Sequence, residues 1–478
     1  MADGIFGDYA PLGFCEVFGG TGMRPHYAGL VSRLDALGPG EIAARSDLVG
    51  TILRRQGITF NVYGHQDGTE RTWPLDLVPR IIPSDEWDHL ERGLAQRVRV
   101  LDLFLDDLYV GDRTALRDGI VPTWLVESSP GYVREAIGIK VPGARCVVSG
   151  IDLVRDIEGT YRVLEDNLRV PSGVAYVLEN RAAMTRVLSS AFEPYRVRPV
   201  NHYGASLLRT LCELGPTGSS DPTVVVLTPG VFNSAYFEHV FLARQMGVEL
   251  VEGRDLVVED GRVLMRTTRG LQKVDVIYRR VNDDAVDPVV FHPGSLLGVP
   301  GLMSAIRSGS VVVANAIGNG VIDDKALYPF VPALIRHYLN EEPILPNVTT
   351  YYPWDPEQLA FILGRLDRLV VKPATESGGY GIVIGPKATA DELDAVGAQL
   401  RADPRAFIAQ EVVELSTHPT WTDSGLRARH IDLRPFVLQG QRVEVVPGGL
   451  TRVALREGSL IVNSSQGGGS KDTWVLAP

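Results

Sequence analysis

The chain has 478 residues, of which 45% are hydrophobic and 22% charged, and a formal net charge of −11. This composition is ordinary for a soluble globular protein of roughly two to four domains. The negative charge argues against a nucleic-acid surface, and the lack of any apolar run of about 18 residues argues against a transmembrane helix.

The three cysteines, Cys15, Cys146 and Cys212, are odd in number and far apart in the sequence. This spacing fits neither a zinc site nor a disulfide framework. We expect small buried thiols in a reducing compartment. The first residues contain no basic region followed by an apolar stretch, as a signal peptide would, so we expect a cytoplasmic protein.

Helices are predicted over residues 26–37, 40–56 and 84–110, with a strand over 60–64. The third helix has the strongest signal, because apolar residues recur there every three or four positions. Another helix is predicted over 179–192.

Two apolar runs flank Glu158-Gly159 within "DLVRDIEGTYRVLEDN" at 152–167, which favours a hairpin with a two-residue turn. That register places Asp152 opposite Glu165. Because directly opposed like charges destabilise a sheet, the two carboxylates need a cation or a buried proton between them.

Asn167 lies on the same face as Glu165, since side chains alternate along a strand. Two carboxylates and an amide oxygen are ligands that Mg²⁺ prefers. The alternative is a solvated acidic hairpin, and the residues alone do not separate the two interpretations. Without a metal, we expect removal of one carboxylate to stabilise the protein by relieving repulsion.

Residues from about 206 to 340 begin with the buried strand "PTVVVLTPG", a helix over 233–246 and the apolar "VELVEG". "VDVIYRR" and "SVVVANAIGNG" add two strands of the same type. The order predicts a small parallel α/β layer, similar to a Rossmann sheet. No GxGxxG motif is present, so we predict no dinucleotide site.

A new pattern follows the Pro- and Asn-rich segment 340–358, and within it "LVVKPATESGGYGIVIG" at 369–385 predicts strand, glycine-rich loop and strand. Lys372 ends the first strand, where its ammonium group can meet a phosphate. Glycines let backbone N–H groups approach phosphate oxygens closely, and a serine adds a hydroxyl donor. The loop residues concerned are Ser377, Gly378, Gly379 and Gly381.

The strand "FIAQEVVELS" at 407–416 ends in polar residues beside apolar walls, as an adenine site requires. Gln410, Glu411 and Val413 would line the base, and Glu414 would reach a ribose hydroxyl. A plain strand with a polar end is the alternative.

The segment "HIDLRPFVL" at 430–438 places Asp432 and Arg434 on one face of a strand. Arg434 would stabilise charge on a transferred phosphoryl group. Alternatively, the two residues form a structural salt bridge. For the C-terminal "SSQGGGSKDTW", a frayed tail is the expectation.

Taken together, these segments resemble the ATP-grasp fold, in which a strand lysine and a glycine-rich loop cover the ATP phosphates and a Glu-x-Asn pair holds Mg²⁺. Here the metal hairpin precedes Lys372 by about 200 residues, which resembles the circularly permuted branch that includes glutathionylspermidine synthetase-like proteins. "VVKPATESGGYG", "ANAIGNGVIDDKAL" and "SSQGGGSKDTWV" are similar to its uncharacterised bacterial type. The resemblance covers nearly the whole chain.

The resemblance implies an α/β fold with α+β elements in three parts. Residues 1–205 would carry the metal hairpin, 206–340 the Rossmann-like layer and 341–478 the nucleotide-binding part. It also implies that Lys325, in "DDKAL", contacts ATP.

One position departs from the family pattern. Glutathionylspermidine synthetases carry Arg-x-Asp at the first metal carboxylate, whereas this chain has Gly150 in "GID". Another cation must then bind the transferred phosphate, and the candidates are Arg169, Arg434 and Arg452.

The resemblance implies an ATP- and Mg²⁺-dependent carboxylate–amine ligase that acts through an acyl phosphate on small-molecule or peptide substrates. Phosphotransfer to a histidine such as His418 or His430, or to a small molecule, stays open. So does a non-catalytic ATP-binding scaffold, although Asp152, Glu165 and Lys372 are all retained.

Overall fold

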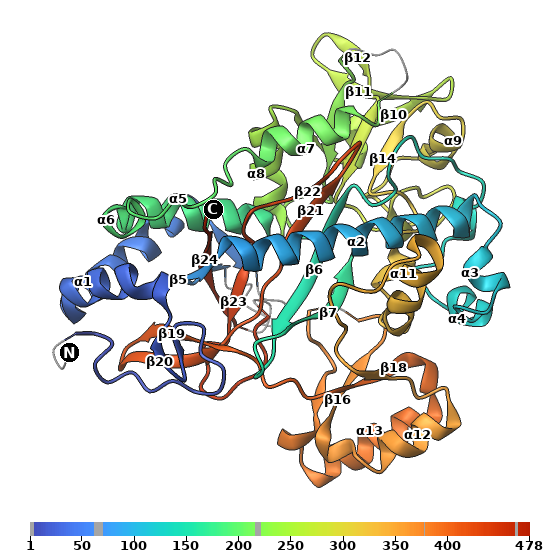
Figure 1. Cartoon of the computed structure of the whole chain (residues 1–478). Helices are drawn as coiled ribbons and strands as arrows, with labels where there is room; N and C mark the ends of the chain where they lie inside the picture. The colour runs from blue at the N-terminus through green and yellow to red at the C-terminus, as the bar shows by residue number, and fades with distance from the viewer. Residues whose placement is uncertain (1–3, 62–69, 216–220, 377, 464–466) are drawn as a thin grey trace.

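The computed structural model describes residues 4–61, 70–215, 221–376, 378–463 and 467–478. Helix α2 (Ser84–Tyr109) crosses the middle of the molecule and packs along the central strands (Figure 1). Its inward stripe is almost fully buried, because apolar residues recur on one face as predicted. These are Trp87, Leu90, Leu94, Val98, Leu101, Leu105 and Leu108.

Helix α1 (Ala28–Arg55) contains both predicted N-terminal helices, which meet at Gly38, where φ is +73°. The stretch predicted at 179–192 forms α5 (Val174–Val187) and α6 (Ser189–Phe192). Strand β3 (Thr59–Asn61) begins the strand predicted over 60–64, and residues 62–64 lie outside the described residues.

The central sheet has the order β22-β21-β6-β7 and is antiparallel throughout. It joins the hairpin β6 (Val148–Arg155) and β7 (Tyr161–Asn167) to β21 (Phe436–Gln439) and β22 (Val443–Val445). The predicted metal hairpin therefore lies beside strands that come almost 300 residues later in the chain.

The two-residue turn predicted at 158–159 is wrong. Asp156 and Thr160 face each other, with the N–H of Asp156 donating to the carbonyl of Thr160 at 3.0 Å, so the loop is one residue longer. The Asp156 carboxylate also accepts the N–H of Thr160 at 2.8 Å, in an Asx-type contact that the sequence pattern does not count.

The predicted pairing of Asp152 with Glu165 is nevertheless confirmed. The ladder shifts register between Leu153, which pairs with Val163, and Asp152. Leu164 is thus an extra residue, a β-bulge, and it cancels the extra residue of the loop. The predicted pairing is correct because the extra loop residue and the bulge residue each shift the register by one, in opposite directions.

The predicted parallel layer is present as a sheet of order β14-β13-β8-β9, with every neighbour parallel. An antiparallel three-stranded sheet between β9 and β13 was not predicted. The layer consists of β8 (Val224–Leu227), α8 (Tyr236–Met246), β9 (Glu249–Val251), β13 (Val276–Arg279) and β14 (Val312–Ala314), and the added strands are β10 (Leu256–Glu259), β11 (Arg262–Thr267) and β12 (Gly270–Lys273).

A smaller unit at the bottom of Figure 1 has its own apolar cluster, confined to residues 351–409. Its sheet order is β15-β18-β16-β17, and the loop between β16 and β17 contains the predicted glycines. The unit comprises β15 (Thr350–Tyr351), α12 (Pro356–Leu363), β16 (Leu369–Pro373), β17 (Val383–Ile384), α13 (Ala390–Ala402) and β18 (Phe407–Glu411).

The C-terminal segment is a buried strand rather than the frayed tail that we expected. All seven residues of β24 (Gly469–Val475) are buried between β5 (Leu75–Ile82), to which β24 is parallel, and β23 (Thr451–Val453). Buried Arg181 binds Asp472 at 2.9 Å. The flanking glycines obscured this strand in the sequence.

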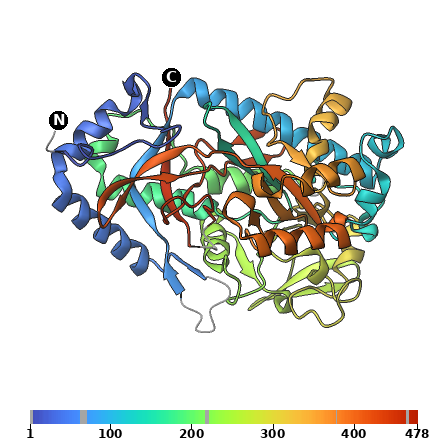
Figure 2. The ribbon, with the colours of Figure 1, turned by 90° about the horizontal axis from the view of Figure 1, so that it is seen from below.

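The two large apolar clusters each include residues from all three predicted segments, and the boundaries after 205 and 340 stay a prediction. Figure 2 shows the elongated shape from below, with the N-terminal helices at one end and the cyan helices near residues 114–127 at the other.

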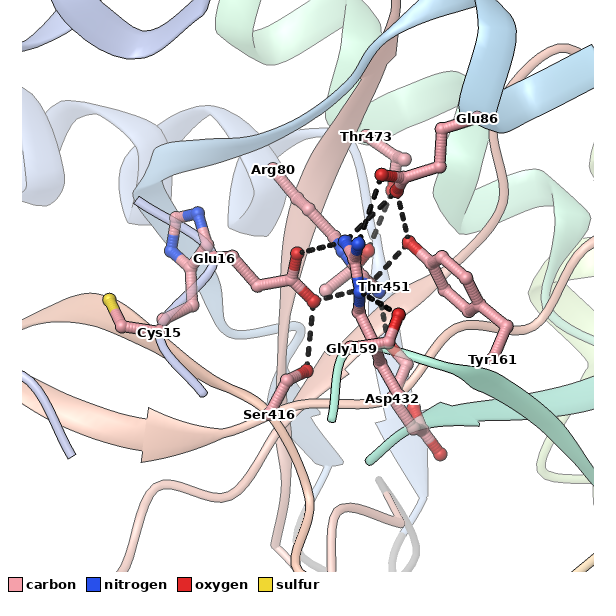
Figure 3. Close-up of polar contacts among 12 residues, drawn as sticks. Cys15, Glu16, Arg80, Glu86, Gly159, Tyr161, Ser416, Asp432, Thr451 and Thr473 are labelled. Atoms are coloured by element: carbon pink, nitrogen blue, oxygen red, sulfur yellow. Dashed lines mark hydrogen bonds and ion pairs between the residues drawn. The ribbon is translucent and has the colours of Figure 1, made fainter. Parts of the chain in front are cut away.

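A buried ionic cluster attaches the N-terminal segment to the hairpin (Figure 3). Glu16 accepts Arg80 at 2.6 Å and Ser416 at 2.8 Å on one carboxylate oxygen, and Arg155 at 2.9 Å on the other. Burial alone would raise the pKa of Glu16, but the two arginines hold it below its ordinary value. The cluster fixes the loop end of the hairpin.

Candidate functional site

A cleft of about 950 Å³, part of it open to solvent, lies between the small unit and the hairpin. Its lining includes an apolar group, suited to a flat ring, and a charged group, suited to phosphates. The apolar group includes Val370, Ile382, Ile384, Val413, Leu415 and Ile461, and the charged group comprises Asp152, Glu165, Lys325, Lys372, Glu376, Glu411, Asp432 and Arg452.

Lys372 projects from β16 into this cleft and is 9% exposed. Its ammonium donates to the side-chain oxygen of Gln410 at 2.5 Å, on the neighbouring strand β18. Burial lowers the pKa of Lys372 to about 8, against the opposing effect of Glu165. Among the described residues, the hydrogen bond of this ammonium goes to a neutral group, which leaves the lysine well placed to bind an anion.

Lys325 follows helix α10 (Gly320–Asp323) and reaches the same cleft. Its ammonium donates to the backbone carbonyl of Glu376 at 2.6 Å and lies 3.5 Å from a carboxylate oxygen of Glu165. The structure thus brings Lys325 and Lys372 together, as the family resemblance implies.

The glycine loop has the backbone geometry that only glycine adopts readily. Gly378 and Gly379 have φ of +73° and +79° and line the cleft. Gly381, at φ +69°, lies instead against Pro373, where a Cβ would come within 2.8 Å of the proline ring. Ser377 lies outside the described residues.

Three of the four predicted adenine-site residues line the cleft: Gln410, Glu411 and Val413. Glu411 accepts the hydroxyl of Tyr351 at 2.8 Å. Glu414 is exposed and is not part of the lining.

At the hairpin end of the cleft, Asp152 is 1% exposed and bound by two arginines. Both of its oxygens accept from Arg434, one of them at 2.7 Å, and Arg452 donates to it at 2.7 Å as well. Burial would raise the pKa of Asp152, but the arginines hold it well below its ordinary value.

These contacts correct two expectations. The cations that neutralise Asp152 are protein side chains, so removing Asp152 would take from Arg434 the carboxylate that it binds through two hydrogen bonds rather than relieve a repulsion. In addition, the alternative Asp432–Arg434 salt bridge is not formed, because Asp432 binds Arg452 at 3.0 Å and Arg434 binds Asp152.

Glu165 and Asn167 are less engaged than Asp152. The carboxylate of Glu165 is 24% exposed and lies 3.7 Å from Arg434. The side-chain nitrogen of Asn167 is buried and has no hydrogen-bond partner among the described residues. Asp166 between them points to the opposite face, where Arg97 binds both of its oxygens at 2.6 Å and fixes the strand.

A second cavity, of about 1,230 Å³, shares Glu165 and Arg452 with the first. Asn167, Arg169 and Arg434 line it, which places all three candidate arginines near the hairpin.

Asp323 also lines this cavity and was missed in the sequence, where "DDKAL" drew attention only to its lysine. Burial raises the pKa of Asp323 to about 6. The two adjacent acids before Lys325 were the available signal.

The stem of Arg434 occupies the space beside Gly150. A Cβ at position 150 would lie 3.7 Å from Cδ of Arg434 and 3.2 Å from Pro171. Gly150 therefore leaves room for an arginine that comes from a different part of the chain.

The match to known proteins agrees with this arrangement. The family model described as circularly permuted ATP-grasp type 2 matches residues 79–454. The chain therefore belongs to the circularly permuted ATP-grasp type 2 family. Its α/β architecture, with the β6–β7 hairpin ahead of strand β16, is the fold expected of that family.

Among similar proteins of this family, an uncharacterized Mycobacterium tuberculosis H37Rv protein is 54% identical over 99% of this chain and 87% of its own length. A Frankia casuarinae protein provisionally named glutamate–cysteine ligase 2-2 is 46% identical over 98% of this chain, which spans 54% of that protein.

Among solved structures, a glutathione synthetase-like effector from Globodera pallida superposes with a TM-score of 0.56. The match covers 91% of this chain and 96% of that one, at 13% identity. It supports the fold alone.

The residues present fit a magnesium ion bound together with ATP. Glu165 and Asn167 both line the second cavity, and a carboxylate together with an amide oxygen is a donor set that Mg²⁺ takes besides waters and phosphates. Among the described residues, no group of three or more His, Cys, Asp or Glu side chains is placed to hold a metal. Asp152 already accepts three hydrogen bonds from Arg434 and Arg452, so Glu165 is the more available carboxylate.

Within the described ranges, no helix is long and apolar enough to cross a membrane.

Proposed function

We propose that this ATP-grasp protein is an ATP-dependent carboxylate–amine ligase. The observation that carries the proposal is the convergence of Lys325, Lys372 and Glu165 on one cleft with apolar walls. Family membership and the ligase name of the Frankia relative support it.

In this proposal ATP lies in the first cleft, with its base beside Gln410, Glu411 and Val413 and its phosphates near Lys325 and Lys372. The loop residues Gly378 and Gly379, which line the cleft, lie along the phosphates. Glu165 and Asn167 would hold Mg²⁺, with Asp152 as the neighbouring carboxylate, and the ion would neutralise charge on the ATP phosphates.

The reaction would proceed in two displacements. A substrate carboxylate oxygen attacks the γ-phosphorus and ADP leaves, giving an acyl phosphate. The amine nitrogen then attacks the acyl carbon, phosphate leaves, and the nitrogen loses a proton to form the amide. The protein holds both substrates in line, and this positioning is the main source of the rate.

Arg434 is the arginine that we assign to the transferred phosphoryl group. It reaches the space beside Gly150, lines the second cavity and lies 3.7 Å from Glu165. Arg452 holds Asp152 and Asp432 and is 7% exposed, which suits a positioning role.

Phosphotransfer to a histidine has less support. His418 is fully buried and lies 3.2 Å from the hydroxyl of Tyr27, and neither it nor His430 lines either cavity.

The test is to incubate the protein with ATP, Mg²⁺, a panel of carboxylic acids and hydroxylamine. An acyl phosphate is trapped as a hydroxamate, whereas a phosphotransferase releases ADP without one. Binding of ATP with no ADP release under any substrate would support a scaffold and overturn the proposal.

A further inference from the structure

The second cavity contains a charged pair that the nucleotide role does not use, Arg169 and Asp323. Both side chains line the cavity that also contains Glu165 and Asn167, and the guanidinium Nε of Arg169 lies 3.9 Å from a carboxylate oxygen of Asp323. The pair is thus next to the proposed phosphoryl-transfer point.

Arg169 differs from the other two candidate arginines in how it is bonded. Its side chain is 35% exposed, against 16% for Arg434 and 7% for Arg452, which bind aspartates tightly. Its buried Nε has no hydrogen-bond partner among the described residues. An arginine with unused donors at a cavity wall is suited to a carboxylate, which it can bind through two parallel bonds.

Asp323 is oriented by the backbone. One carboxylate oxygen accepts the N–H of Leu168 at 2.7 Å and that of Arg169 at 3.2 Å. The other oxygen lies on the side of Arg169, and the side chain is 22% exposed. The carboxylate therefore has a fixed direction and retains capacity to accept a further hydrogen bond.

We propose, resting on the ligase function above, that Arg169 and Asp323 bind the α-carboxylate and α-ammonium of an acidic amino acid whose side-chain carboxylate is phosphorylated. An adjacent cation and anion are complementary to the two main-chain charges of a free amino acid. With both main-chain groups held, the carboxylate left to react is that of the side chain. Asn167, two residues before Arg169, lines the same cavity beside Glu165, where the phosphoryl transfer is proposed.

The experiment uses the full chain in two stages. Calorimetry first measures MgATP binding by the wild type, Arg169→Gln, Arg169→Lys, Asp323→Asn and Asp323→Glu. Hydroxamate formation with ATP and hydroxylamine is then measured with L-glutamate, L-aspartate, N-acetyl-L-glutamate and glutarate. Asp323→Asn keeps an oxygen that can accept the N–H of Leu168 while removing the charge.

We expect glutamate or aspartate to give hydroxamate at least about tenfold more efficiently than the N-acetyl compound and glutarate. We also expect Arg169→Gln and Asp323→Asn to raise the KM for the amino acid by about 10- to 100-fold, with MgATP affinity unchanged. The charge-retaining variants should recover part of this loss. Arg254→Gln, at a side chain 78% exposed, is the matched control.

Equal activity with glutarate or the N-acetyl compound, an unchanged KM in both variants, or activity only with acids that are not amino acids would overturn the inference and leave the ligase proposal standing. Failure of the wild type to bind MgATP would refute the ligase proposal itself, and this inference with it.

Discussion

The buried ionic clusters around Glu16 and around Asp152 use the same residue types but differ in how completely they are paired. Around Glu16 (Figure 3), Arg80, Arg155 and Ser416 occupy both carboxylate oxygens. Around the hairpin end, Asp152 is equally well bound, yet within the described part of the chain the cations nearest to Glu165 are Lys325 at 3.5 Å and Arg434 at 3.7 Å.

The difference distinguishes a cluster with a structural role from a cluster that can bind a ligand. A closed cluster has no capacity left for a ligand, so it holds chain segments together. In the hairpin cluster, Asp152 is paired with two arginines. Glu165, Asn167 and Lys372, which line the cavities, keep capacity to bind a ligand. Buried groups with incomplete pairing are a physical indicator of a binding site.

The largest expected effect comes from a substitution that breaks the fully paired cluster around Glu16. Glu16→Gln leaves Arg80 buried beside a neutral group and should lower the free energy of unfolding by about 3–5 kcal/mol. Urea denaturation measures this. Glu342→Gln, which disrupts an exposed pair with Arg336, is the control and should leave the free energy of unfolding nearly unchanged. Similar losses for the two variants would mean that the Glu16 cluster is not structural.

A substitution at the incompletely paired side of the hairpin cluster should lower activity and leave stability nearly unchanged. Glu165→Ala should lower ATP-dependent product formation by about 10²- to 10³-fold, as loss of a group that stabilises transition-state charge does, with little change in melting temperature. Glu158→Ala, at the exposed tip of the hairpin, is the matched control. Full turnover by Glu165→Ala would refute the catalytic role.

Lys372→Met tests binding at the same open side. Loss of one charge-assisted contact should weaken MgATP by about 10- to 150-fold in calorimetry. Because burial disfavours its charge, the ligand-free variant should also melt at a higher temperature. Lys387→Met, at an exposed lysine of the same unit, should change neither quantity.

The smallest effect is in the pH dependence. Lys372 has a pKa of about 8 in the folded protein, so its charge is present below pH 8 and lost above it. MgATP affinity should fall by up to about tenfold between pH 7 and 9, and the fall should disappear in Lys372→Met. For the ligand-free protein the sign is reversed: its stability should rise with pH from about 8 to 10.5, where the unfolded chain binds the proton more tightly. An unchanged affinity profile in the variant would exclude Lys372 as the titrating group.

Local patterns in the sequence were sufficient for α1, α2, α5 and α8 and for several of the polar residues that line the cleft. The apolar stripe of α2 and the lysine before the glycine loop are both short-range signals. Pairings between distant segments were not predictable. Arg434 reaches Asp152 across 282 positions, and Asp323 meets the end of the hairpin across 155, and no periodicity encodes such contacts.

The hairpin shows a subtler limit. Its functional register was predicted from a turn that does not exist, and the bulge at Leu164 compensated. The C-terminal strand was missed because two glycines precede it and a third begins it, and its charged residues Lys471 and Asp472 are buried with partners that come from far away in the chain. The polar composition of this strand suggested exposed side chains, whereas their pairing with distant segments buries them.

The position of β24 has a consequence for how the chain is made. This strand is synthesised after β5, its parallel neighbour, by nearly 400 residues. During synthesis on the ribosome, β5 lacks its parallel neighbour until β24 has emerged. Until then, the apolar face of β5 stays available to other partners. Expression of this protein should therefore depend on chaperones that shield a nascent chain.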